Sequence, residues 1–577
     1  MDDKPKQIKC TMRLLKKGTS PDDAMAEEHG LESYRWEGIP DARVFAGTIY
    51  TSAPTWIPFV KESVSQLPKL TNRGSAAIIF VPADDRVIAV CFGHAQFGLD
   101  LDKFERGFGL RVTLNCVART SLRNIDTAAP DAVTVQRRIQ ASRDSDLSVF
   151  GIDFDQDIVT LAAGTPGNKD FARFLAGKDS LSITCPMEPS ELQAKCNDVL
   201  KTYKSTDYRA QFGWIDHVRA IKEKDLVERL DGLLSKEIQK MRRGDDSDLH
   251  LTPPEIVDYT EGAEVHYNGF GSEGRTFACL NIEDYINELN RVDFQGEIEE
   301  IRAQHRIAVR KEGENRFAEK WKLFDSFVFD ATYNKKKYVL FSGDWFEIDK
   351  KFADEVVAFF DALPRVAIIG SSDQPNETKL IEHLNVSRSG DLLMLDQVKI
   401  NPEGVRYANL EPCDFLSAAK QFIHIKDGHS SGPISHLWNQ GVVAAEAFLM
   451  DVEFRRKLRA AVKKKNASFA TLLPDGREKV VPTDYSIVYA IMREKRASGD
   501  VDLPFFSKVS LRTAARRLEM MGFPVYLELI LKTGPFSSHA RAAAAKKAAK
   551  IKAKSNAKVK KSPKPVAKLE AKAKSRV

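Results

Sequence analysis

The spacing of apolar and polar positions changes several times along the chain. Short apolar runs, or apolar residues at every second position, predict strands at residues 8–14, 75–81, 85–92, 392–396 and 486–492. Apolar residues three and four positions apart predict helices at residues 226–241, 352–360, 434–449 and 511–521. Because helices and strands follow one another throughout, the predicted fold class is α/β, of the mixed α+β kind.

Breaks in this pattern divide the chain into two lobes. The polar run 244–248 ends a charged helix, and two prolines after Thr252 mark a linker. A hairpin made of 327–330 and 337–341 then opens the second half. We expect four parts: an N-terminal α/β recognition or regulatory lobe at 1–250, a linker and helical region at 251–325, a second lobe at 326–536 and a tail at 537–577.

The composition is that of a globular protein, and 577 residues allow several domains. No run of about 18 apolar residues exists, and the polar start lacks the apolar segment of a signal peptide. We therefore expect a cytoplasmic protein with no membrane partner. The seven cysteines are scattered and never spaced as Cys-x-x-Cys, which argues for reduced thiols and against a disulfide framework or a zinc site.

Charge is divided unevenly along the chain. The formal net charge is +6, but residues 537–577 contain fourteen Lys or Arg and one acid, Glu570, so the remainder is acidic. This tail alternates small residues with lysine, cannot bury a core and is expected to be disordered when free. Such a tail binds polyanions through counterion release, which predicts a nucleic-acid tether. A solubilising or targeting appendage is the alternative.

Residues 411–440 hold the main candidate chemistry. Asp414 precedes a strand whose side chains alternate between faces, so His424 and Lys426 are expected on one face. Gln440 lies on the helix that follows. Carboxylates hold a hard divalent cation that polarises a phosphate, and a lysine steadies the attacking water or the developing charge. The combination suits phosphodiester cleavage, whereas an ordinary edge strand with a solvated lysine is the alternative.

This stretch resembles the PD-(D/E)XK nuclease superfamily, in which an acid is followed by an acid-x-Lys strand and, in some branches, by a helical glutamine. The resemblance implies a restriction-endonuclease-like second lobe. It also implies that Asp414 is a metal ligand, that His424 occupies the second ligand position and that Lys426 is the catalytic lysine. Gln440 would then face the site from its helix.

The resemblance further implies an acid on the preceding helix, which is Glu377, with Glu382 as the competing choice. His424 departs from the superfamily pattern, because that position usually holds Glu or Asp. Imidazole is a poorer ligand for Mg²⁺ than carboxylate and a better one for Mn²⁺, so the expected cofactor is Mg²⁺ or Mn²⁺. Either Glu411 supplies the missing charge as a further metal ligand, or the site is weak or inactive.

A basic helix start is one candidate for nucleic-acid binding. The helix predicted at 511–521, capped by Ser510 and ended by Gly522, offers free N–H groups to a phosphate. Lys508 and Arg512 are adjacent to that start and are expected to bind nucleic acid.

Two other basic segments are also candidates. The helix predicted at 454–465 carries Arg455 and Arg456, which could contact a DNA backbone. Segments 119–127 and 137–144 concentrate arginines among hydroxyl and amide side chains, which could grip phosphates. The alternative, which the sequence supports at least as well, is that these arginines are exposed and pair with acids in the same segments.

Nearly the whole chain resembles a sporadically distributed family of bacterial proteins whose function is uncharacterised. The segments that carry this resemblance are 119–127, 137–144, 338–348, the stretch 411–440 and 503–512. The sporadic occurrence resembles that of mobile defence or restriction genes, and no activity follows from it.

We therefore expect a metal-dependent nuclease that cleaves DNA in phage defence or restriction, with RNA not excluded and a partner protein from the same locus as a candidate activator. The alternative is a catalytically inactive DNA-binding sensor or scaffold, and a third is a structural protein that the tail localises. The sequence has no Walker-type loop, so any nucleotide dependence would have to come from elsewhere.

Overall fold

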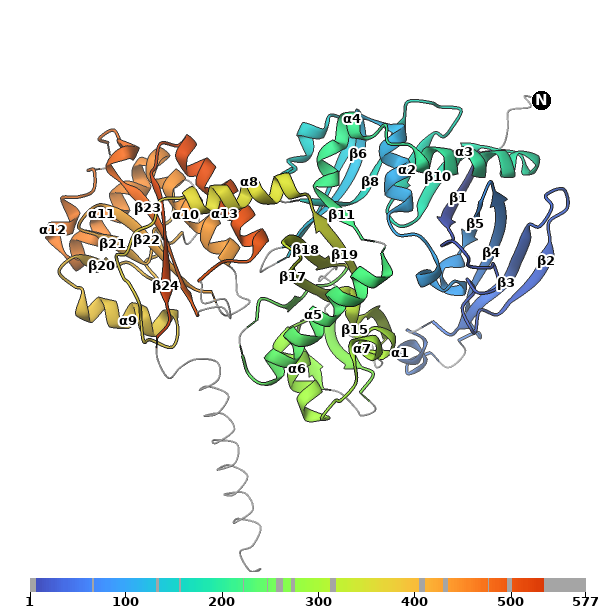
Figure 1. The fold of residues 1–577 in the computed structure, drawn as a ribbon, viewed down its shortest axis with the longest axis horizontal. Coiled ribbons are helices and arrows are strands. Elements are labelled where there is room, and N and C mark those ends of the chain that lie inside the picture. Colours follow the sequence, from blue (N-terminus) through green and yellow to red (C-terminus); the bar gives the residue numbers. More distant parts are fainter. Residues whose placement is uncertain are drawn as a thin grey trace, which may run out of the picture. The chain divides into compact units, whose positions relative to one another are not determined.

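The computed structural model describes residues 7–533 except 55, 65–66, 131–133, 155–156, 222, 246, 256–262, 271–274, 312–317, 404–409, 429–433, 476 and 495–500. The protein is a mixed α+β structure, as predicted (Figure 1). It divides into two compact units: Met1–Leu233, Leu249–Ala362 and Pro504–Thr513 form the first, and Leu234–Asp248, Leu363–Leu503 and Ala514–Val577 form the second. The predicted tail 537–577 lies outside the described residues.

The first unit contains a ten-stranded antiparallel sheet. Its strands in spatial order are β2 (Leu31–Arg35), β3 (Arg43–Ser52), β4 (Asn72–Ala83), β5 (Arg86–Gly93), β1 (Gln7–Leu14), β10 (Leu181–Pro186), β9 (Phe174–Gly177), β8 (Ile158–Pro166), β6 (Val117–Ala129) and β7 (Val135–Ser145). The strands predicted at 75–81 and 85–92 are confirmed as parts of β4 and β5. These two strands form a hairpin, and Asp84 takes a positive φ of 45° in its turn.

Side-chain alternation gives this sheet two apolar faces. Ile79 and Val81 of β4 join the core that contains Phe108 and Leu192, whereas Ile78 and Phe80 of the same strand join a separate core. Helices α2 (Phe108–Cys116) and α3 (Leu192–Lys204) therefore pack on the first face.

Two smaller sheets complete the first unit. One has the order β11 (Val218–Ala220), β19 (Asp344–Ile348), β18 (Lys336–Phe341), β17 (Phe327–Tyr333) and β12 (His250–Leu251), and the other has the order β14 (Thr276–Phe277), β13 (Ala263–Asn268), β15 (Arg306–Lys311) and β16 (Ala318–Lys322). The predicted hairpin near 327–341 is present as β17 and β18, but it belongs to the first unit.

The remaining helices of the first unit are short to medium in length. They are α1 (Ile57–Lys61), α4 (Arg209–Phe212), α6 (Ile282–Arg291), α7 (Ile298–Gln304) and α8 (Lys350–Ala362). Helices α5 (Lys224–Arg242) and α13 (Phe505–Met520) each have residues in both units. No helix in the described part of the chain is both long enough and apolar enough to cross a membrane.

The second unit is built on a five-stranded mixed sheet, β20 (Leu392–Met394), β21 (Phe415–Ser417), β22 (Gln421–Asp427), β23 (Ser486–Arg493) and β24 (Val525–Leu531). The pairs β20–β21 and β21–β22 are antiparallel, and β22–β23 and β23–β24 are parallel. Its helices are α9 (Glu377–Ser387), α10 (Ile434–Met450), α11 (Val452–Lys465) and α12 (Ala467–Ala470).

Helices cover the two faces of this sheet. Leu380 and Leu384 of α9 pack with Ile423 and Ile425 of β22. On the opposite face, Trp438 of α10 packs edge-on against Tyr489 of β23 with ring centroids 4.8 Å apart. The strands predicted at 392–396 and 486–492 and the helix predicted at 434–449 are confirmed, with small differences at their ends.

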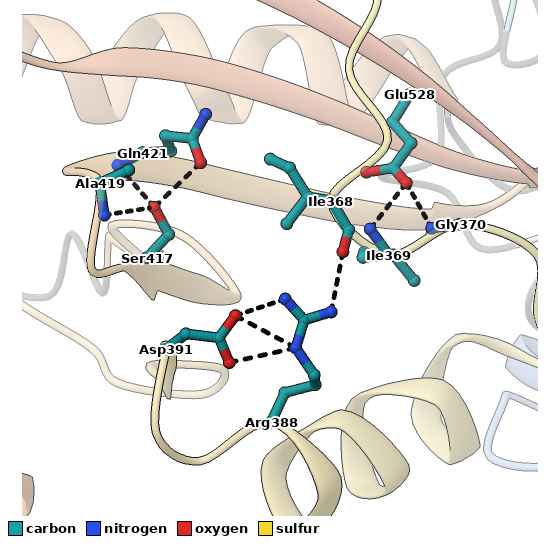
Figure 2. A network of polar contacts seen from close by, with 9 residues as sticks. All are labelled: Ile368, Ile369, Gly370, Arg388, Asp391, Ser417, Ala419, Gln421 and Glu528. Atoms are coloured by element: carbon teal, nitrogen blue, oxygen red, sulfur yellow. Dashed lines mark hydrogen bonds and ion pairs between the residues drawn. The ribbon is translucent and has the colours of Figure 1, made fainter.

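A polar network fixes the segment that leads into α9 (Figure 2). Buried Glu528 of β24 accepts hydrogen bonds from the N–H groups of Ile369 and Gly370 at 2.8 and 2.7 Å. Arg388, just after α9, pairs with Asp391 and donates to the Ile368 carbonyl at 2.8 Å. The segment 368–370 is therefore bonded both to β24 and to the residue that follows α9.

The prediction that a helix begins after Ser510 is wrong. Helix α13 begins at Phe505, and the Ser510 hydroxyl donates back to the Phe506 carbonyl at 3.0 Å. The first helical N–H, that of Phe505, is capped by Oδ2 of Asp330 at 2.8 Å, a partner 175 residues away. A cap so distant in sequence leaves no local signal. The predicted end is confirmed, because Gly522 has a φ of +89° directly after the helix.

Candidate functional site

The candidate site lies along one edge of β22. Strand β21 is short and pairs with β22 only at Ile423 and Phe422. Beyond that point Oδ2 of Asp414 accepts a hydrogen bond from the N–H of Ile425 at 2.6 Å. Oε2 of Glu377 accepts one from the N–H of Asp427 at 3.3 Å. Two carboxylates therefore take the place of a neighbouring strand, at N–H groups about 7 Å apart.

Local sequence explains how Glu377 reaches this edge. The Asn376 side chain caps α9 by accepting from the N–H of Lys379 at 3.0 Å. Glu377 is thus the first residue of the helix, where the helix dipole favours a negative charge. Glu382, the competing choice, is one turn further along and pairs with Lys379 at 2.6 Å. The structure therefore places Glu377, and not Glu382, beside β22.

Lys426 lies between these carboxylates along the strand and contacts one of them directly. Its Nζ is 3.0 Å from Oε2 and 3.1 Å from Oε1 of Glu377. Both side chains are about a quarter exposed, at 28% and 27%. A half-buried ammonium at this position is accessible to an anionic ligand while its charge is balanced by Glu377.

Asp414 is a strongly perturbed acid. Burial raises its pKa from the ordinary 3.8 to about 7, and the N–H of Ile425 opposes this rise. The negative charges of Glu377, Asp396 and Glu411 raise the pKa further. Three carboxyl groups therefore disfavour the charged form of Asp414, and a cation bound beside Asp414 would offset that repulsion.

The donor set can be tested against the metal that the sequence predicts. In the described part of the chain no group of three or more His, Cys, Asp or Glu residues is arranged to hold a metal ion. Mg²⁺, however, is commonly held by one or two carboxylates together with water and substrate phosphates. Asp414 and Glu377 would supply those two carboxylates, with Glu411 contributing charge nearby.

His424 does not join this group. Its ring is 3% exposed and lies 5.9 Å from the Tyr489 ring, in the core beneath α10. Burial lowers its pKa to about 4, and its Nε2 has no hydrogen-bond partner among the described residues. Strand alternation predicts that His424 and Lys426 share a face of β22. Lys426 lies near the end of that strand, and its long side chain reaches Glu377, whereas the His424 ring lies in the core. Gln440 is exposed on α10.

The residues predicted to bind nucleic acid on α13 are buried. Lys508 is 6% exposed, with Nζ 4.3 Å from the Phe360 ring centroid, and Arg512 is 2% exposed and lies over Phe352 at 5.2 Å. Because the helix begins five residues before Ser510, neither cation flanks a free helix start. Phe505 and Phe506 pack in a core with Val356.

Arg455 and Arg456 have different environments. Arg455 is 6% exposed and donates from Nη1 to the carbonyls of Phe448 and Leu449, both at 2.9 Å, so it caps the end of α10. Arg456 is exposed and pairs with Glu453 at 2.7 Å. Of the two, only Arg456 is open to a ligand.

Replacing Arg455 with glutamine is expected to lower the unfolding free energy of the second unit by about 2 kcal/mol, because one buried and one partly buried carbonyl lose a charged donor. Thermal unfolding would measure the change. Arg456→Gln is the matched control, and its midpoint should stay at that of the unmodified protein. Equal shifts for both variants would contradict the capping role.

The arginine-rich segments 119–127 and 137–144 are neighbouring strands, β6 and β7. Arg138 pairs with Asp126 at 2.7 Å, and Arg123 pairs with Asp144 at 2.6 Å. Arg123 and Arg138 are therefore paired with acids of the neighbouring strand, which was the alternative to phosphate binding.

One ion pair near the site was not predicted. Nζ of Lys532, after β24, lies 3.0 Å from Oδ2 of Asp427, and both side chains are nearly buried. Asp427 directly follows Lys426, so it closes β22 with a charge-balanced pair. In the sequence, this ion pair was indicated only by the position of Asp427 next to Lys426.

Comparison with family models gives one match, described as a family of unknown function (DUF6119), over residues 10–531. The chain belongs to this family. Membership agrees with the whole-chain resemblance and assigns no activity. Comparison with curated proteins and with solved structures gives no match.

Proposed function

We propose that this DUF6119 protein is a metal-dependent nuclease that cleaves phosphodiester bonds in DNA. The observation that carries the proposal is the edge of β22, where Asp414 and Glu377 bind successive outward N–H groups and Lys426 contacts Glu377. The order α9, β20 to β22, α10 and a parallel β23 also follows the helix, strands and helix that the PD-(D/E)XK resemblance implies. A restriction-endonuclease-like fold for this unit is part of the proposal.

Each residue has a distinct role in this proposal. Asp414 and Glu377 would hold Mg²⁺ or Mn²⁺, which when bound supplies Lewis-acid activation of the phosphate and of a water molecule. Lys426 would steady the attacking water or the charge that develops on the phosphate. Because the pKa of Asp414 is raised to about 7, cation binding there would be favoured at a pH above that value, where the carboxyl group is ionised.

The setting of this activity is proposed from the resemblance alone. Phage defence or restriction would fit a sporadic family, with a partner protein from the same locus as activator. The lysine-rich tail 537–577 would tether the protein to DNA or RNA by its charge.

A second candidate is a catalytically inactive DNA-binding sensor or scaffold. The observation that favours it is His424, which stands where the superfamily has an acid and is buried away from the carboxylates. In that case the protein binds DNA without cutting it.

The test is cleavage by the full chain of supercoiled plasmid, single-stranded DNA and RNA, each with Mg²⁺, Mn²⁺ or EDTA. Metal-dependent nicking that EDTA stops supports the nuclease. DNA binding without cleavage in either metal supports the sensor, and cleavage that persists in EDTA contradicts the role given to the carboxylates.

A further inference from the structure

The first unit contains a cavity that the proposed nuclease site does not use. Its volume is about 230 Å³, and its lining includes the aromatic residues Phe154, Tyr203, Tyr208, Trp214 and Phe346. Ligand sites are typically concave, mainly apolar pockets with a few polar groups. The size suits one small flat ligand and not an extended chain.

Arg111 of α2 is the unusual residue in this lining. Its guanidinium carbon lies 5.6 Å from the ring centroid of Tyr203 and 5.6 Å from that of Tyr208. Its guanidinium makes no hydrogen bond or ion pair with any residue that the structure describes. The side chain is half-buried and its Nε is fully buried. A partly desolvated cation beside two aromatic rings is unfavourable without an anion.

The other charged residues in the lining are already balanced. Asp216 accepts from the Tyr208 hydroxyl at 2.6 Å and from Arg209 at 2.7 Å. Asp157 pairs with Arg137 at 3.0 Å. Arg219, which is mostly exposed, lies 3.8 Å from Glu347. Among the charged residues of the lining, Arg111 is therefore the one without an anionic partner in the described part of the chain.

Arg106 is balanced in the same way. It pairs with Asp325 at 3.2 Å and lies 3.5 Å from Asp344, and these acids raise its pKa further above its ordinary value, against the lowering effect of its burial. It therefore does not compete with Arg111 for an anion.

Two further polar atoms of the lining lack partners. The indole Nε1 of Trp214 and the Nδ1 of His217 are both buried without a hydrogen-bond partner among the described residues. The Trp214 ring packs against Phe154 with centroids 4.9 Å apart, which leaves an aromatic wall next to an unused donor. An unmade buried hydrogen bond is unfavourable, so a ligand that supplies acceptors gains from this site.

We propose that this cavity binds a mononucleotide unit, with the base against the aromatic wall and the phosphate at Arg111. A flat π-system is the ligand that aromatic walls favour, and an anion is what a stacked, unpaired arginine lacks. The unit could be a free nucleotide or one nucleotide of a strand, since both present the same base and phosphate. The proposal does not depend on the nuclease site.

Calorimetry on the full chain tests it with adenosine, cytidine and guanosine 5′-monophosphates, the matching nucleosides and inorganic phosphate as probes. At least one monophosphate should bind at a single site, about tenfold or more tighter than its nucleoside or phosphate alone. No monophosphate binding at millimolar concentration, or equal binding of nucleoside and monophosphate, would overturn the proposal.

Arg111→Met keeps the apolar stem and should weaken monophosphate binding about tenfold to a hundredfold. Because it removes a half-buried charge that has no anionic partner among the described residues, the ligand-free variant should unfold at the same or a higher temperature than the unmodified protein. Arg123→Met, which breaks a surface pair with Asp144, is the control and should bind normally. Unchanged binding in Arg111→Met would overturn the proposal even if the protein folds.

A short single-stranded oligonucleotide separates the two sources of the ligand. If it displaces a bound monophosphate, the cavity takes a nucleotide from a strand; if the monophosphate stays bound, the free nucleotide is the ligand. Trp214→Phe, which keeps an aromatic side chain but removes the N–H and part of the stacking surface, should weaken either form of binding. DNA cleavage can be absent while this binding is present, so failure of one proposal is distinguishable from failure of the other.

Discussion

Replacing Glu377 with glutamine, or Asp414 with asparagine, is expected to lower metal-dependent DNA cleavage at least about a hundredfold. Each amide keeps an oxygen that can accept from the β22 backbone, at Asp427 or Ile425, so the strand edge is preserved. What is lost is the negative charge that a hard divalent cation requires. Initial rates of plasmid nicking at several metal concentrations would measure the effect.

Glu382→Gln is the matched control for this prediction. It makes the same chemical change on the same helix, but Glu382 is exposed and bonded to Lys379. Its cleavage rate should equal that of the unmodified protein. If Glu377→Gln cleaves as fast as Glu382→Gln, the carboxylates of the β22 edge are not the catalytic site.

Lys426→Met separates metal binding from catalysis. Loss of the ammonium should slow cleavage, because the charge that develops on the phosphate then loses one of its proposed stabilising groups. Metal affinity should be kept or improved, since Glu377 loses the cation that now occupies it at 3.0 Å. A variant that loses metal binding as well would place Lys426 in a structural role.

Asp414→Asn is expected to make the metal-free protein more stable than the unmodified protein. The difference in unfolding free energy should grow as pH rises. The pKa of Asp414 in the folded protein is about 7, above its ordinary 3.8, so between these values the folded state holds a proton that the unfolded state releases. Stability therefore falls as pH rises through this window and levels off above 7. Asparagine cannot ionise, and by pH 8 the variant should be more stable by up to about 4 kcal/mol.

Unfolding of both proteins in EDTA at pH 5, 6, 7 and 8 would measure this difference. The gain should be smallest at pH 5 and largest at pH 8. Mn²⁺ should then stabilise the unmodified protein and have little effect on Asp414→Asn, because the cation replaces the proton. A stability difference that does not change with pH would contradict the raised pKa.

Asp391→Asn is the control with the opposite sign. Arg388 holds the pKa of Asp391 below its ordinary value, so that carboxylate stabilises the fold above that value and its contribution is lost as pH falls. The variant should therefore lose stability near neutral pH instead of gaining it. Opposite responses from two aspartates of one unit would exclude a general effect of removing negative charge.

Local pattern determined much of this structure. The strands β4, β5, β20 and β23, the helix α10 and the hairpin of β17 and β18 were all predicted from spacing and turn residues. These elements could be predicted because their periodicity and their turns depend on residues that are close together in the sequence. The resemblance likewise named Glu377, Asp414 and Lys426 as a set, because their order along the chain is itself the motif.

Long-range contacts decided the rest. The sequence does not distinguish a basic residue that faces solvent from one that caps a helix. The burial of Arg455, Lys508 and Arg512 therefore could not be predicted. The start of α13 depends on Asp330, which is 175 residues away. No local rule reports a partner at that separation.

The two candidate sites divide in the same way. The sequence by itself named the residues that are proposed to hold a cation. Only the tertiary structure decided that β21 ends early and leaves the N–H groups of Ile425 and Asp427 to two carboxylates. The cavity around Arg111 had no sequence signal at all, because its walls come from segments between Arg106 and Phe506. The spacing of residues predicts which side chains lie on one face of a helix or strand. Whether a polar group lacks a hydrogen-bonding or charged partner depends on how distant segments pack together.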